Sequence, residues 1–131
     1  MPVAGVGDDG AKPAEAAGLD MSYRADQGYF IVTLCGALNA AIAPVLREYL
    51  LKLTHESAGR LIIDVSAVTD ADSHGLSVLV GTRHRANLLG GPLRLAGPAA
   101  EVAGMLTRTG LDRQLRIYDS VEAAISSAAS P

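Results

Sequence analysis

The stretch DVSAVTDADSHGL, residues 64–76, decides the fold because it joins an apolar strand to a helix. The preceding run over residues 60–65 is almost continuously apolar, which is typical of a strand buried on both faces of a parallel sheet. Asp72 and Ser73 favour a turn or a helix cap, and apolar residues recur at helical spacing from Leu76 onward. The stretch therefore predicts a central strand, a short polar loop and a helix that begins at Ser73.

Strands and helices alternate on both sides of this stretch. The earlier part predicts strands over 21–24 and 29–35 joined by a turn at 26–28, then a helix from Ala40 with Pro44 in its first turn. The later part predicts a helix over 73–89, a strand over 93–96, a helix over 99–108, a strand over 114–118 and a helix that Ser120 caps. We expect an α/β fold, in which a mixed β-sheet with an opening hairpin packs against about four helices.

The length of 131 residues and the hydrophobic content of 49% fit one domain with a substantial core. Residues 1–18 are rich in Ala, Gly and Pro and carry little bulky apolar surface, so we expect a flexible N-terminal tail followed by a domain over 19–131. Cys35, the single cysteine, lies in an apolar strand and is expected to be buried and inert.

Charge and composition exclude several classes of partner. The net charge of -3, the scattered basic residues and the absence of Trp argue against a nucleic-acid surface. The sequence lacks an apolar run of the roughly 20 residues needed to span a bilayer, and it lacks a secretory signal. We therefore expect a cytoplasmic protein that neither binds nucleic acid nor inserts into a membrane.

Ser73 has two readings from the residues alone. A hydroxyl at the start of a helix lies beside free backbone N–H groups and the positive end of the helix dipole, where a phosphate is stabilised. An Asp-Ser pair before an apolar helix is also a common helix cap. The sequence allows both a modification site and a structural cap.

Four motifs, in a fixed order, resemble the STAS domains of bacterial anti-sigma factor antagonists. Residues 72–76, DSHGL, resemble the Asp-Ser-Ser-Gly-Leu helix start of that family, and residues 36–39, GALN, resemble its Gly-Glu-Leu-Asp turn. Residues 93–98, LRLAGP, and residues 109–112, TGLD, resemble two later landmarks. The resemblance extends from about Asp20 to Ser127 and implies a single STAS-like domain.

The resemblance also implies a function. An antagonist of this family binds an anti-sigma factor, commonly a serine kinase, and so releases a sigma factor; phosphorylation of the serine matched by Ser73 switches it off, and a serine phosphatase restores it. The chain would be substrate and ligand, not an enzyme. The implied contact surface, together with the exposed face of the following helix, comprises Asn39, Asp72, Ser73, His74, Gly75 and Leu76.

Three departures from the family pattern leave an alternative open. His74 replaces a small hydroxyl residue, and Ala37 and Asn39 replace two acids, which makes the adjoining surface less acidic. Asn39 also suits the N-cap of the helix that follows it. The alternative is an unphosphorylated STAS scaffold or subunit of a transport system or larger signalling complex.

The spacing of the polar residues gives little support for an enzyme or a metal-binding protein. His84 lies eleven residues beyond Ser73, about 16 Å along a helix, and the Gly-x-Ser-x-Gly turn of a hydrolase is missing. His55, His74 and His84 lack metal-ligand spacing, and no Gly-rich phosphate loop indicates a nucleotide cofactor. We expect no cofactor and no metal, and the oligomeric state stays open.

A set of basic residues has two interpretations, a docking patch or solvated helix faces. Its members are Arg83, His84, Arg85, Arg94 and Arg108.

Overall fold

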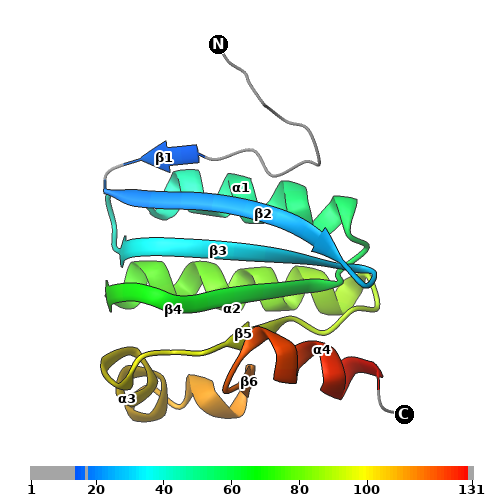
Figure 1. Ribbon diagram of the computed structural model, residues 1–131. Helices are drawn as coiled ribbons and strands as arrows, with labels where there is room; N and C mark the ends of the chain where they lie inside the picture. The colour runs from blue at the N-terminus through cyan, green and yellow to red at the C-terminus, as the bar shows by residue number, and fades with distance from the viewer. Residues whose placement is uncertain (1–13, 17, 130–131) are drawn as a thin grey trace.

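The computed structural model describes residues 14–16 and 18–129, which form a six-stranded sheet with its strands in chain order (Figure 1). The first three strands pair antiparallel, and the third to sixth pair parallel. The strands are β1 (Ala14–Ala16), β2 (Leu19–Asp26), β3 (Tyr29–Leu38), β4 (Leu61–Ala71), β5 (Arg94–Ala96) and β6 (Arg116–Tyr118). The helices are α1 (Ala43–Glu56), α2 (Ser73–Leu88), α3 (Ala100–Arg108), the 3₁₀ turn η1 (Leu111–Arg113) and α4 (Val121–Ala129). The predicted mixed α/β fold is confirmed.

The opening hairpin is closed by a two-residue turn. Gln27 and Gly28 both have positive φ angles, 53° and 86°. This pairing is typical of the type I′ turn, whose twist matches that of the flanking antiparallel strands. The turn fixes the register between β2 and β3, which runs from Asp26 opposite Tyr29 to Leu19 opposite Gly36.

Helices cover the two faces of the sheet unequally. Figure 1 shows α1 and α2 together behind β2, β3 and β4, whereas α4 lies on the opposite side near β5 and β6. The larger core, between the sheet and α1, α2 and α3, includes Val32, Leu34, Leu46, Ile63, Leu79 and Leu106. The smaller core, under α4, includes Ile31, Ile62, Ala96, Val121, Ala124 and Ile125. On the face that carries α4, the part formed by β2, β3 and β4 that α4 does not cover can therefore hold polar side chains.

Strand β4 extends to Ala71, so the polar loop predicted before Ser73 is strand. Val68 and Ala71 are buried in the larger core, while Ser66 and Thr69 lie exposed. A bulge interrupts the pairing with β3, and there the Asp64 carboxylate accepts hydrogen bonds from the N–H and hydroxyl of Ser66 at 3.0 and 2.7 Å. The polar residues of this stretch belong to a half-exposed strand.

Two further expectations need correction. Part of the predicted tail, Ala14–Ala16, forms β1 and pairs with residues 19–21; the rest of the tail before it lies outside the described residues. Cys35 is exposed, because it points away from the larger core and lies beyond the area that α4 covers. The predicted cap of the last helix is confirmed, since the Ser120 hydroxyl accepts the N–H of Ala123 at 3.0 Å.

Candidate functional site

The candidate site lies where β3 and β4 end side by side. Leu38 is the last residue of β3, and its carbonyl accepts the N–H of Asp72 at 2.9 Å, immediately after β4. The chain then enters α2 at Ser73. Two parallel strands thus bring the loop over residues 39–42 and the start of α2 to one edge of the sheet (Figure 1).

Asp72 is the N-cap of α2 and also holds the neighbouring loop. Its Oδ1 accepts the backbone N–H groups of His74 and Gly75 at 2.9 and 3.0 Å. Its Oδ2 accepts the N–H of Ala40 at 3.2 Å. The bond from Gly75 is the main cause that lowers the pKa of Asp72, helped by the bonds from His74 and Ala40. Asp72 is therefore a carboxylate in the folded protein.

The capping role of Asp72 bears on both interpretations of Ser73, as a helix cap and as a modification site. Because Asp72 caps the helix, Ser73 is its first residue and the cap reading of Ser73 is wrong. The N–H groups of His74 and Gly75, expected to be free beside Ser73, are occupied by the Asp72 carboxylate. A phosphate on Ser73 would therefore lie next to a fixed negative charge.

Asn39 organises the loop on the other side of the site. Its side-chain oxygen accepts the N–H groups of Ala41 and Ile42 at 3.1 and 3.2 Å. The helix α1 begins only at Ala43, so Asn39 caps the turn that leads into α1 instead of the helix itself. Its half-buried side chain is committed to this turn.

Gly75 and Leu76 were expected in the contact surface but are buried. A Cβ atom on Gly75 would overlap the backbone carbonyl of Leu38, so glycine lets the start of α2 pack directly on the end of β3. Leu76 is only 3% exposed and belongs to the larger core. Both residues position the site and offer no side chain to a partner.

Ser73 and His74 are exposed, as is Asp72. His74 presents its ring to solvent with Nδ1 3.7 Å from Oδ1 of Asp72, and its side chain is 66% exposed. The backbone carbonyl of Ser73 accepts a hydrogen bond from the hydroxyl of Ser77 at 2.7 Å. Ser73 itself is exposed. A serine, a histidine and a carboxylate thus form one small exposed surface above Asn39.

Sequence reasoning did not identify Leu38 and Ala40 as parts of this site. Both contribute through the backbone, Leu38 as an acceptor and Ala40 as a donor. Leu38 and Ala40 lie 34 and 32 residues before Asp72, and backbone groups that act across such a separation leave no pattern in side-chain chemistry. The only available signal was the pair of turn-forming residues, Asn39 in the GALN turn and Asp72 in the predicted polar loop before the helix.

The predicted basic patch is divided by the fold. Arg94 is only 6% exposed, with its guanidinium carbon 5.5 Å from the centre of the Tyr29 ring and Nη1 donating to the Pro92 carbonyl at 3.3 Å. It is buried because this side of the short strand β5 lies under α4. Arg85 and Arg108 remain exposed on separate helices.

Within the described residues, no group of three His, Cys, Asp or Glu side chains is placed to hold a metal ion. None of the helices in that part of the chain has the length and apolar character needed to cross a membrane.

The family model described as the STAS domain matches residues 20–124, which span the five elements from β2 to α2, apart from the first residue of β2, and most of the remainder. This chain belongs to the STAS domain family. The matched region places the site of Asp72 and Ser73 inside the domain.

Individual relatives agree with the STAS assignment. The anti-sigma-B factor antagonist of Bacillus subtilis is 36% identical over 80 residues, which cover 61% of this chain and 72% of the relative. The crystal structure of an anti-sigma factor antagonist from Mycobacterium paratuberculosis superposes with a TM-score of 0.76 at 23% identity, over 83% of this chain and 92% of that chain. The same STAS fold is found within murine Slc26a9, an anion transporter (TM-score 0.71, 23% identity, 82% of this chain and 19% of that chain).

Proposed function

We propose that this STAS protein is an anti-sigma factor antagonist that binds an anti-sigma factor through the exposed residues Asp72, Ser73 and His74 and the half-buried Asn39 beside them, and thereby releases a sigma factor. The observation that carries the proposal is the exposed Ser73 at the first turn of α2, in a chain that is 36% identical over 80 residues to the anti-sigma-B factor antagonist. The chain is a binding protein, not an enzyme. It acts in the cytoplasm.

Phosphorylation of Ser73 is the proposed switch. The anti-sigma factor, acting as a serine kinase, adds the phosphate, and a separate serine phosphatase removes it. A phosphoserine carries about two negative charges, and here it joins the Asp72 carboxylate. Desolvating so much like charge against a partner is unfavourable, so modification favours dissociation.

The hydrogen bonds and the close packing around Ser73 support this switch. Asp72 fixes the first turn of α2 and the loop at Ala40, and Gly75 packs that turn on Leu38. A preorganised surface of this kind loses little conformational entropy when a partner binds. The added charge then acts directly on the interface.

A second candidate, a STAS scaffold or subunit of a transport or signalling complex, rests on His74 and on the missing acids at Ala37 and Asn39. The imidazole of His74 is the bulkiest exposed group beside Ser73 and restricts the approach of a kinase. The fold shared with Slc26a9 is compatible with such a role.

The test is affinity purification of the tagged chain from its host, followed by mass spectrometry of the partners and of the Ser73 peptide. We expect an anti-sigma factor and a phosphorylated fraction of Ser73. With the purified partner, Ser73→Glu should weaken binding at least tenfold, and Ser73→Ala should bind like the wild type but accept no phosphate from the partner and ATP.

The matched control is Asn87→Glu, which adds the same charge at an exposed position near the far end of α2. It should leave binding unchanged. Wild-type affinity of Ser73→Glu would overturn the charge switch. Recovery of transport subunits without modification of Ser73 would favour the scaffold.

A further inference from the structure

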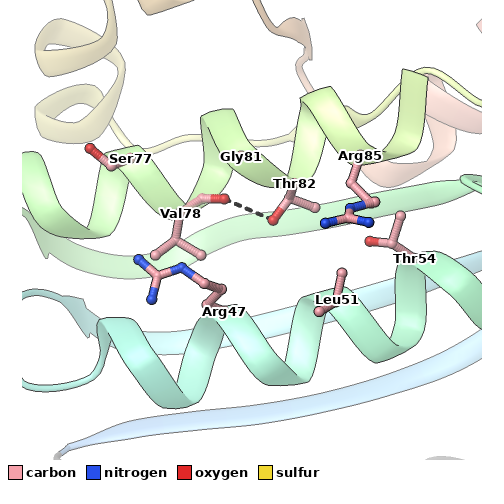
Figure 2. Close-up of a pocket in the computed structure, with 8 residues that line it drawn as sticks. All are labelled: Arg47, Leu51, Thr54, Ser77, Val78, Gly81, Thr82 and Arg85. Atoms are coloured by element: carbon pink, nitrogen blue, oxygen red, sulfur yellow. Dashed lines mark hydrogen bonds between the residues drawn. The ribbon is translucent and has the colours of Figure 1, made fainter. Parts of the chain in front are cut away.

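A shallow groove runs between α1 and α2 on the side of the helix layer that faces solvent (Figure 2). Its volume is about 180 Å³. The residues that define it are Arg47 and Leu51 from α1 and Ser77, Gly81, Thr82 and Arg85 from α2. Ser77 lies one turn after Ser73, so the groove begins beside the exposed surface of the candidate site.

Two arginines stand at opposite ends of the groove. Figure 2 shows Arg47 next to Val78 at the end nearer Ser77, and Arg85 above Thr54 at the other end. Neither arginine forms an ion pair with any residue in the described parts of the chain, 14–16 and 18–129. Two cationic groups therefore face this groove without a compensating negative charge.

The middle of the groove is open and apolar. Gly81 occupies the interior of α2, where glycine is less favourable than alanine by about 1 kcal/mol. A Cβ atom there would meet nothing within 4 Å, so packing inside this chain does not require glycine. Across from it, Leu51 is 37% exposed. The missing side chain leaves room for a group from another molecule.

The size of the groove argues against a small-molecule ligand. Pockets for cofactors and drug-sized ligands usually enclose about 300–1,000 Å³, well above the volume found here. A groove between two helices with an apolar centre instead suits the apolar stripe of a third helix. The arginines at its ends select acidic side chains on that helix.

We propose that this groove, formed by Arg47, Leu51, Gly81 and Arg85, receives an acidic amphipathic helix of the anti-sigma factor, with small or apolar residues over Gly81 and carboxylates at the two arginines. Arg47 lies next to Val78 (Figure 2), so Val78 marks its position along α2. Val78 and Arg85 are seven residues apart, about 10.5 Å along the axis of α2. The partner helix then carries its two acids two turns apart, at positions i and i+7. The inference rests on the proposed function and extends the interface beyond Ser73.

The experiment measures the dissociation constant of the full chain with the purified anti-sigma factor that co-purifies with the wild type. The double variant R47E/R85E should weaken binding at least tenfold, and raising the salt concentration should weaken binding of the wild type more than that of the variant. Gly81→Leu, which fills the open centre, should also weaken binding at least tenfold. Circular dichroism and thermal unfolding verify that each variant is folded.

Two control variants test whether the loss of binding depends on substitution within the groove. Arg113→Glu reverses an exposed charge on η1, and Asn87→Leu adds the same apolar side chain elsewhere on α2; both should bind like the wild type. A photo-crosslinking residue at position 81 should label a partner helix that carries Asp or Glu at i and i+7. Replacing those two acids by Lys should restore binding to R47E/R85E.

These experiments distinguish failure of the groove proposal from failure of the proposed function. Unchanged affinity of folded R47E/R85E and Gly81→Leu, while Ser73→Glu still loses binding, overturns the groove and leaves the proposed function standing. Crosslinks from position 81 only to basic or non-helical segments also overturn it. A wild-type chain that binds no anti-sigma factor overturns both.

Discussion

The Asp72 carboxylate accepts the backbone N–H of Ala40 at 3.2 Å, across 32 residues of sequence. The same carboxylate caps α2 through the N–H groups of His74 and Gly75. One side chain thus joins the loop after β3 to the helix after β4. This shared acceptor therefore ties together the two segments that flank Ser73.

We expect Asp72→Ala to lower the midpoint of thermal unfolding, because three backbone donors lose their acceptor at once. Hydrogen exchange should accelerate at Ala40, His74 and Gly75 while protection in the centre of β4 changes little. Asp72→Asn is the control, since its side-chain oxygen can retain the helix cap. Equal exchange rates in the wild type and Asp72→Ala would show that the cap contributes nothing to the connection between these two segments.

The stability of the protein should fall at acid pH partly through Asp72. Hydrogen bonds, first that from Gly75, lower the pKa of Asp72 below its ordinary value of 3.8. The folded state then binds this proton less tightly than the unfolded state, so the contribution is fully present above the ordinary pKa and is lost as pH falls below it. Urea unfolding of the wild type and Asp72→Asn should differ less at pH 2 than at pH 6.

Two glycines of α2 should respond to alanine in opposite ways. At Gly75 the new Cβ overlaps the Leu38 carbonyl, and such overpacking typically costs about 1–3 kcal/mol. At Gly81 it enters open space, where the gain in helix propensity is about 1 kcal/mol. Urea denaturation of Gly75→Ala and Gly81→Ala measures both. Similar changes for the two variants would contradict the packing of Gly75 on Leu38.

The order of strands and helices could be predicted from the sequence because its signals are local. Apolar residues at helical spacing indicate helices, and the pair Gln27 and Gly28 produces a hairpin turn in the structure. The length of β4 could not be predicted in this way. Its polar residues Ser66 and Thr69 face the part of the sheet that α4 leaves uncovered, and the reach of α4 is a tertiary property.

The location of the candidate site could be predicted from the sequence, but the role of each residue in it could not. The DSHGL motif marked the start of α2, yet only the structure assigns the cap to Asp72, the exposed position to Ser73 and a buried position to Leu76. Arg94 shows the same limit, because its burial depends on α4 and Tyr29, elements far away in the chain.

Cys35 should react rapidly with a thiol reagent in the native state, because its side chain is exposed on the uncovered face of the sheet. Labelling with DTNB without denaturant should be complete, at a rate within about tenfold of that in urea. Cys35→Ser is the control and should show no reaction. Labelling that requires urea would mean that another surface covers this face in solution.

Tyr49 should be the last tyrosine to ionise. Burial is the main cause that raises its pKa from 10.0 to about 12, with a further contribution from the charge of Tyr23. Its hydroxyl is buried and has no hydrogen-bond partner among the described residues. A titration followed by absorbance at 295 nm should therefore show a late component that Tyr49→Phe removes.

The same substitution tests the link between this pKa and stability. A raised pKa means that the folded state keeps the proton more tightly, so the contribution of the neutral phenol is present below pH 10 and is lost as pH rises from 10 to about 12. Tyr49→Phe cannot ionise and should lose less stability than the wild type over that interval. At pH 7 it should be as stable as the wild type or up to about 1 kcal/mol more stable, because it removes a buried hydroxyl that lacks a partner. A clear loss of stability at pH 7 would indicate that the hydroxyl does have a hydrogen-bond partner in solution.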